Sequence, residues 1–210
     1  MTNKKDWFYA LIISLFIISA AVVCTVFFKP LYYFDIDLLN IDTYVGMSKD
    51  IIKHNYNILI DYQSIFYRGD LLLPDFIMSE TGRIHFVEVK RIFEAIQILF
   101  MITGISSLLI LLKNKKEIIY LKLSSFLTIA IPTVIGLLAS IDFDAAFVIF
   151  HKIFFRNDYW IFDYRTDPII MILPQDFFMH CFIMIVVLIM LGSLMTYIIY
   201  KRKEHKILQK

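Results

Sequence analysis

Four long runs of apolar residues divide this chain, and each is long enough to cross a lipid bilayer. The runs cover residues 8–28, 92–112, 118–140 and 177–200. An α-helix rises about 1.5 Å per residue, so about twenty residues span a hydrocarbon core about 30 Å thick. Ser, Thr and Gly recur within the runs, as is typical of helices that pack against one another in lipid. The pattern therefore predicts a membrane all-α protein, a four-helix transmembrane bundle.

The overall composition agrees with a membrane protein. Hydrophobic residues make up 59% of the 210 residues and charged residues 19%, with a mean hydropathy of +0.70, whereas soluble domains are about 45–50% apolar and about 25% charged. Cys24 and Cys181 both lie inside apolar runs, which excludes a disulfide framework between the runs. We expect the first run to be a retained anchor, since it has 21 residues and no small-residue cleavage site closes it.

The basic residues predict the orientation of the spans. Eleven Lys and Arg residues flank the chain termini and the short turn at 113–117, against three acidic residues. Segments 29–91 and 141–176 together hold ten basic and fifteen acidic residues. Because short cytoplasmic flanks are enriched in Lys and Arg, we predict cytoplasmic termini at 1–7 and 201–210, a cytoplasmic turn at 113–117, and two outward-facing segments at 29–91 and 141–176.

The first outer segment is too long for a plain loop. Residues 57–67 partly alternate apolar and polar side chains, which predicts a strand, and Arg68, Gly69 and Asp70 then predict a turn before a second extended piece. Residues 42–54 show the pattern of a short amphipathic helix begun by an Asp or Thr cap. We therefore expect a small α+β extracytoplasmic cap on the outer face.

Each outer segment carries a histidine close to an apolar run, where ionisable groups are costly and therefore functional candidates. His85 precedes the second run by seven residues, with Glu88 and Lys90 nearby. If this piece is helical, Glu88 lies on the same face, and its carboxylate would raise the pKa of the imidazole and prepare a general base. The alternative is a surface histidine that hydrogen-bonds to the backbone.

His151 lies in a cluster of aromatic residues between Phe147 and Trp160. Such a cluster is also typical of the aromatic belt at a membrane boundary. A belt does not account for the polar residues Arg156, Asn157 and Asp158, of which Arg and Asn can donate hydrogen bonds to a developing oxyanion. Both interpretations stay open on these residues alone.

The other polar candidates are weaker. His180 falls just inside the fourth run, where a single packing contact is the simplest explanation, and His54 and His205 are expected on solvated faces. Zinc held by His85, Glu88 and His151 is an alternative, but the chain has no HExxH or HxH spacing to support it. We expect no metal and no cofactor.

Five pieces of the chain together resemble one membrane family, the lipoprotein intramolecular transacylases of Gram-positive bacteria. They are Leu73-Pro74-Asp75-Phe76, His85 to Lys90, the FHxxFFxNDxWxF element from Phe150 to Phe162, Thr166-Asp167, and Pro174 to Phe178. The resemblance covers essentially the whole chain, and the FHxxFFxNDxW element is specific.

The resemblance implies an acyltransferase that makes lyso-form lipoproteins at the outer leaflet of the cell membrane. The substrate would be a diacylglyceryl lipoprotein, whose sn-2 acyl chain moves to the α-amino group of its N-terminal cysteine. Two essential histidines of the family correspond to His85 and His151, with His85 expected as the base and His151 as the second proton-transfer group. We expect the following residues to bind substrate, stabilise the oxyanion or orient these groups: Glu88, Lys90, Arg156, Asn157, Asp158, Trp160 and Asp167.

The expected partners are the lipoprotein substrate and membrane lipid, with no nucleic acid and a monomeric protein. Two other functions stay open on the sequence: a non-enzymatic membrane docking protein, and a membrane acyltransferase that takes its acyl chain from phospholipid.

Overall fold

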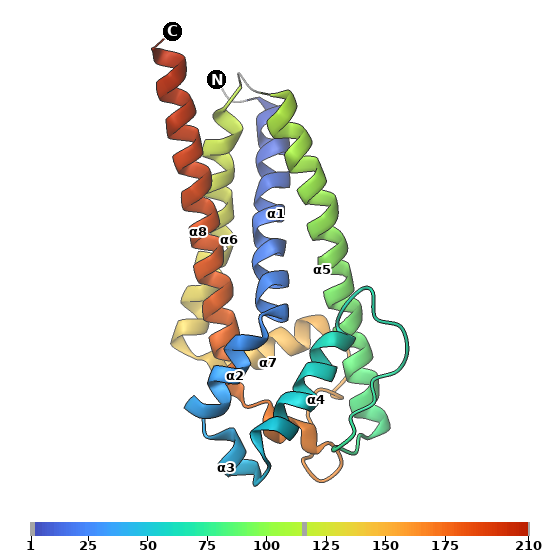
Figure 1. Cartoon of the computed structure of the whole chain (residues 1–210). Helices are drawn as coiled ribbons and strands as arrows, with labels where there is room; N and C mark the ends of the chain where they lie inside the picture. Colours follow the sequence, from blue (N-terminus) through green and yellow to red (C-terminus); the bar gives the residue numbers. More distant parts are fainter. Residues whose placement is uncertain (1–2, 115–116, 210) are drawn as a thin grey trace. The chain divides into compact units, whose positions relative to one another are not determined.

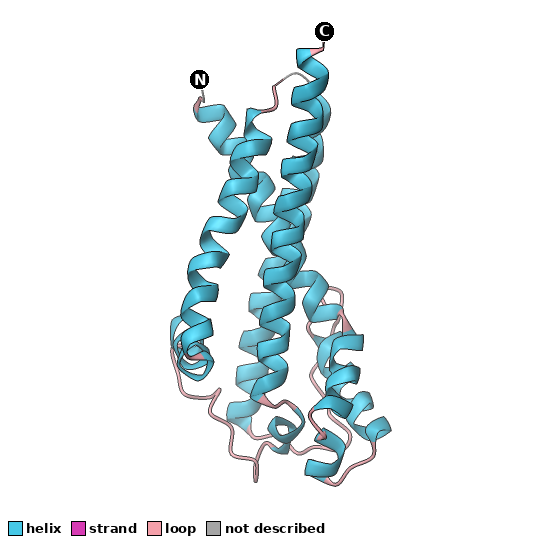
Figure 2. Cartoon of the chain, turned by 90° about the vertical axis from the view of Figure 1, so that its left-hand side faces the viewer, coloured by secondary structure: helices cyan, strands magenta, loops and turns pink. Residues whose placement is uncertain are grey.

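The computed structural model of the chain describes residues 3–114 and 117–209, and it is helical throughout the described elements, with no strand among them (Figures 1 and 2). Residues 115 and 116 of the predicted turn, and the extreme termini, lie outside the described residues. The elements are α1 (Lys4–Phe27), α2 (Lys29–Leu38), α3 (Ile41–Val45), α4 (Lys49–Tyr62), α5 (Glu80–Lys113), α6 (Ile119–Ile141), α7 (Phe143–Phe154), the 3₁₀ helix η1 (Pro168–Ile172) and α8 (Gln175–Leu208).

The chain forms two compact units. Unit 1 contains Met1–Val23, Ile96–Ile141 and Ile183–Lys210, and unit 2 contains Cys24–Ala95 and Asp142–Phe182. The long helices α5 and α8 therefore begin in unit 2 and end in unit 1.

Unit 1 is built on close contacts between apolar helices that run side by side (Figure 1). The Ser14 hydroxyl of α1 donates to the Ser124 carbonyl oxygen of α6 at 3.1 Å, and the Ser193 hydroxyl of α8 donates to the Ser125 carbonyl oxygen at 2.7 Å. Phe16 of α1 stacks on Phe100 of α5, with ring centroids 5.6 Å apart. Small polar side chains thus let these backbones approach one another, as expected for helices in lipid.

Three helices in the described part of the chain are long and apolar enough to cross a membrane: α1, α5 and α8. Within α6, the apolar stretch that can be assessed is shorter, at Ile119–Ala130. The predicted helical membrane character is therefore confirmed.

Unit 2 has its own core of aromatic and branched side chains. Tyr32 of α2 and Tyr56 of α4 stack with ring centroids 3.7 Å apart, and Phe177 of α8 meets both rings edge-on. The Tyr32 hydroxyl donates to the Ile172 carbonyl oxygen at 2.6 Å. His180 makes the single polar packing contact expected of it, with Nδ1 2.8 Å from the buried Asp35 carboxylate.

The predicted strand at 57–67 is wrong, and so is the α+β character of the cap. Residues up to Tyr62 continue α4, and the remainder is a loop in which Gly69 has a φ of +112°. The buried residues of α4 include Ile52, Tyr56 and Leu59, spaced four and three residues apart. This is the period of one face of a helix, so the partial alternation that suggested a strand was incidental.

The helix expected at 42–54 is two helices. α3 ends at Val45 because Gly46 adopts a left-handed conformation, with a φ of +68°. α4 begins at Lys49, after the Ser48 side chain accepts a hydrogen bond from the Ile51 amide. A serine therefore caps α4, and the expected Asp or Thr cap is not used there.

Candidate active site

The first turns of α5 are fixed by Asp167, whose side chain is only 2% exposed. One carboxylate oxygen accepts from the Ser79 amide at 2.8 Å, directly before the helix, and the other accepts from the Thr166 hydroxyl at 2.8 Å. Gly82 lies against this carboxylate. A Cβ atom at this position would overlap the carboxylate and would lie 3.2 Å from the Phe162 ring. Sequence reasoning missed Gly82, although a glycine one turn before His85 could have indicated a close approach.

Helices α5 and α7 bring the two predicted histidines together. Their ring centroids are 6.1 Å apart, and both side chains are buried, with His85 only 5% exposed. Phe155 lies against both rings, at 4.7 Å from His85 and 5.6 Å from His151. Phe162 meets His85 edge-on at 5.4 Å. The two imidazoles therefore share an aromatic enclosure in unit 2.

Helix α7 explains why His151 points inward while its neighbours do not. The Asp142 side chain caps the helix by accepting from the Ala145 amide at 2.9 Å. Phe150 and Ile153 are exposed, while His151 is buried on the opposite face. The predicted aromatic cluster thus contains both a lipid-compatible apolar face and an inward-facing imidazole.

The hydrogen bond of His151 determines its tautomer. Its Nδ1 lies 2.7 Å from the Phe147 carbonyl oxygen, one turn earlier in α7. A carbonyl oxygen can only accept, so Nδ1 carries the proton. In the neutral ring the lone pair is then on Nε2, which is the atom that can accept a proton from a substrate.

Burial disfavours the charged form of both rings. The pKa of His85 is lowered from its usual value of 6.5 to about 4, first by burial and then by the neighbouring His151 ring. Burial also lowers the pKa of His151, and its hydrogen bond to Phe147 partly opposes that change. The prediction that Glu88 raises the pKa of His85 is wrong in direction, because loss of hydration dominates the ring's surroundings.

The Glu88 carboxylate faces Asn157 instead of His85. Its Oε1 accepts from Asn157 Nδ2 at 2.9 Å, and Asn157 Oδ1 accepts from the Tyr159 amide at 3.0 Å, which fixes the amide orientation. The other oxygen, Oε2, is buried and has no hydrogen-bond partner among the described residues. His85 and Glu88 are thus neighbours on α5 whose side chains have separate partners.

Trp160 joins the enclosure from the chain that follows α7. Its indole stacks on His151 with ring centroids 4.6 Å apart. The indole Nε1 is buried and has no hydrogen-bond acceptor within the described part of the chain. His85 Nδ1 is also buried and has no hydrogen-bond partner there. Buried polar atoms are nearly always hydrogen-bonded in native proteins, so this concentration of unpartnered atoms indicates a ligand site.

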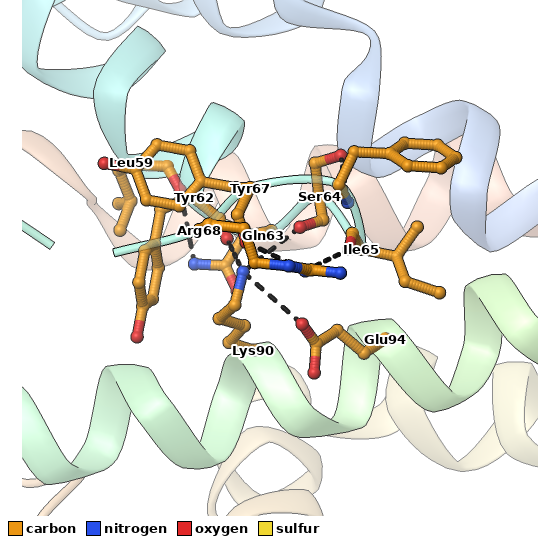
Figure 3. A network of polar contacts seen from close by, with 10 residues as sticks. Leu59, Tyr62, Gln63, Ser64, Ile65, Tyr67, Arg68, Lys90 and Glu94 are labelled. Carbon is orange, nitrogen blue, oxygen red and sulfur yellow. Dashed lines mark hydrogen bonds and ion pairs between the residues drawn. The ribbon is translucent and has the colours of Figure 1, made fainter. Parts of the chain in front are cut away.

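Lys90 serves a different purpose from the histidines (Figure 3). Its ammonium donates to the carbonyl oxygens of Tyr62 and Ser64, the latter at 3.1 Å, and lies 3.5 Å from Glu94. It also lies over the Tyr62 ring, 4.6 Å from the centroid. The carbonyls at the end of α4 have no partner within the helix, so Lys90 joins the end of α4 to α5.

Arg156 and Asp158 are not brought to the histidines by any contact between described residues. Both side chains are exposed, and Asp158 contributes only its carbonyl oxygen, which accepts from the Ile161 amide at 3.1 Å. The zinc alternative also finds no support, because no group of three or more potential ligands occurs among the described residues.

The chain matches known proteins over nearly all of its length. The family model for the lipoprotein intramolecular transacylase Lit matches residues 7–178. The structure of Lit from Bacillus cereus is similar over 100% of both chains, with 42% sequence identity and a TM-score of 0.92. Structures of that protein with an H85R or an H85A mutation give TM-scores of 0.85 and 0.86 over 98% of this chain, covering 95% and 96% of those chains.

No curated protein sequence matches this chain significantly. The family model nevertheless covers far more than half of the residues, and the solved structures agree with it in both identity and fold. The chain belongs to the lipoprotein intramolecular transacylase Lit family.

Proposed function

We propose that this chain moves the sn-2 acyl chain of a diacylglyceryl lipoprotein to the α-amino group of its own N-terminal cysteine, giving the lyso-form lipoprotein. The observation that carries the proposal is the pair of buried imidazoles on α5 and α7, 6.1 Å apart and surrounded by aromatic rings. Family membership supports the same activity. The amine and the ester that react belong to one molecule, so holding them together gives a high effective concentration.

The reaction needs only proton transfer and stabilisation of one negative charge. The amine nitrogen attacks the ester carbonyl carbon, forming a C–N bond and a tetrahedral oxyanion. The nitrogen then loses a proton, the C–O bond to glycerol breaks, and the glycerol oxygen takes up a proton. Ester-to-amide transfer is favourable, so we propose that no cofactor or metal takes part.

His151 is the proton carrier in this proposal. Its Nδ1–H is held by the Phe147 carbonyl oxygen, which leaves Nε2 as the free lone pair. Nε2 takes the proton from the attacking nitrogen and returns it to the glycerol oxygen. This assignment differs from the order expected from the sequence, in which His85 was the base.

His85 and Trp160 stabilise the oxyanion. A histidine whose pKa is about 4 is a poor proton acceptor near neutral pH, but its neutral ring still offers an N–H donor. The buried Trp160 Nε1–H is a second donor. Preorganised donors in a site that excludes water stabilise a developing oxyanion strongly.

We further propose that α6 is the fourth span and that both termini are cytoplasmic. The first turn of α1 and the last turn of α8 lie at the same end of unit 1 (Figures 1 and 2). Lys5 pairs with Glu117 at 3.0 Å, which brings the turn before α6 to that end as well. The protein acts as a monomer in this proposal, with the histidines at the outer leaflet.

The deciding experiment uses purified protein and a synthetic diacylglyceryl lipopeptide with a free α-amine, without phospholipid. Mass spectrometry should show an acyl shift of unchanged total mass, and the shift should disappear with His151→Ala. A shift that requires added phospholipid would identify a phospholipid-dependent acyltransferase. No shift under either condition would leave a docking protein.

A further inference from the structure

The free oxygen of the Glu88 carboxylate lies in a setting that suits a cationic ligand. Oε1 is engaged by the neutral Asn157 amide, and Oε2 is buried without a partner in residues 3–114 and 117–209. No Lys, Arg or His side chain of those residues lies within ion-pair distance of it. A carboxylate removed from water without a cationic partner is costly, so a ligand cation at Oε2 would be bound strongly.

The local structure holds this carboxylate in place. Asn157 is itself fixed by the Tyr159 amide, which donates to Oδ1 at 3.0 Å, so its NH₂ group must face Glu88. Glu88 lies three residues after His85 on α5, and residues at that spacing share one helix face. The same loop carries Trp160, whose indole stacks on His151. The carboxylate therefore lies on the face of α5 that carries His85, beside the loop that carries Trp160.

We propose that Glu88 Oε2 is the receptor for the free α-ammonium group of the lipoprotein's N-terminal cysteine. The inference rests on the proposed function, because the neutral amine that forms when this ammonium gives one proton to water is the nucleophile of the reaction. An α-amino group has an ordinary pKa of about 7.7–8.0 and is largely cationic at pH 7. A hydrogen bond that joins two charged groups is about twice as strong as one between neutral groups.

The receptor also explains how substrate is separated from product. The starting lipoprotein carries a cationic nitrogen, whereas the lyso-form product carries a neutral amide with a single N–H. Once the acyl chain has moved, the ion pair with Glu88 no longer exists. The product is therefore released, and lipoproteins that are already N-acylated are rejected.

Binding measurements can test the receptor separately from catalysis. The probes are two lipopeptides with ether-linked chains, which cannot undergo acyl transfer: one has a free α-amine, and its des-amino analogue has hydrogen in place of the amine. Wild-type full-length protein at pH 7 should bind the amine at least about tenfold more tightly. Equal affinity for the two probes in the wild type would overturn the inference without any variant.

Two variants on the same helix sharpen the test. Glu88→Gln keeps the shape of the side chain and should reduce the preference for the amine to below about twofold. Glu80→Gln removes an exposed carboxylate that pairs with Arg83 and should leave the preference unchanged. A Glu88→Gln protein that folds and still prefers the amine tenfold would contradict the assignment. Failure of the acyl-shift assay would instead contradict the proposed function, because the ether probes report binding alone.

Discussion

At the scale of residues, the surroundings of each side chain decide its chemistry more than its type does. His85 and His151 are the same residue in one enclosure, yet only His151 has a backbone acceptor that fixes its tautomer. The Nδ1 atom of His85 has no hydrogen-bond partner in the described part of the chain, and the pKa of His85 is lowered to about 4. The two rings are therefore suited to different steps.

Replacing His85 tests its role as a hydrogen-bond donor. His85→Ala should lower the rate about 10²–10³-fold, as expected for loss of one oxyanion donor. His85→Gln retains an N–H donor, so its rate should be at least tenfold higher than that of His85→Ala. If His85 were the general base, Gln could not accept the proton, and both variants would be equally slow.

The lowered pKa of His85 makes a prediction about acid. Its pKa is about 4 in the folded protein and about 6.5 in the unfolded chain. Between these values only the unfolded chain binds the proton, so the free energy of unfolding should fall as the pH drops from 6.5 to 4. His85→Gln should flatten this slope in thermal unfolding followed in detergent.

The His151 ring is the second cause of the lowered pKa of His85. In ring-nitrogen NMR, His151→Gln should therefore move the titration of His85 upward from about 4. A midpoint that stayed in place or fell would show that burial alone sets it.

Gly82 is a further residue whose size matters. A methyl group there would meet the Asp167 carboxylate, so Gly82→Ala must displace the group that fixes the start of α5. We expect a loss of about 1–3 kcal/mol in stability, as for other overpacked sites, together with lower activity. The control is Gly136→Ala in α6, where an added methyl group would meet no described atom within 4 Å. Equal melting temperatures for both variants would contradict the expectation.

At the scale of elements, polar side chains fix the helices that carry the site. Asp167 holds the N-terminal end of α5, Asp142 begins α7, and Lys90 joins α5 to the end of α4. Each satisfies backbone groups that a helix end leaves without an internal partner. The positions of His85 and His151 thus depend on polar residues at the ends of the helices that carry them and of α4.

Removing the Lys90 ammonium should release the end of α4. Lys90→Met loses the donors to Tyr62 and Ser64 while keeping the apolar stem. Hydrogen exchange in residues 62–68 should rise, and stability should fall by about 1.5–3 kcal/mol, the usual range for hydrogen bonds to a charged group. Arg91→Met, at the exposed neighbouring position, should change neither.

At the scale of the whole molecule, the charge distribution and unit 1 make a joint prediction about topology. A cysteine introduced at Asn114, close to the turn after α5, should react with an impermeant thiol reagent only after the cells are opened. A cysteine at Tyr44, which is exposed in α3, should react in intact cells. Labelling of the Asn114 position from outside would refute the proposed orientation.

The amino-acid sequence alone determined the class of protein and its family. Apolar runs long enough to span lipid, and the motif around His85 and His151, are local properties that need no tertiary information. The helical membrane character and the family resemblance drawn from them are both confirmed. The strand at 57–67 failed because a short segment can mimic alternation while its buried residues follow a helical period.

Only the tertiary structure decided how the site residues are partnered. The pKa of His85 moves downward because of burial and the neighbouring His151 ring. Neither burial nor a contact between residues 66 positions apart can be read from local sequence. Glu88 meets Asn157, 69 residues later in the chain, and Lys90 meets the end of α4. Burial from water and long-range contacts arise only when the chain folds. They set the pKa and the orientation of each side chain.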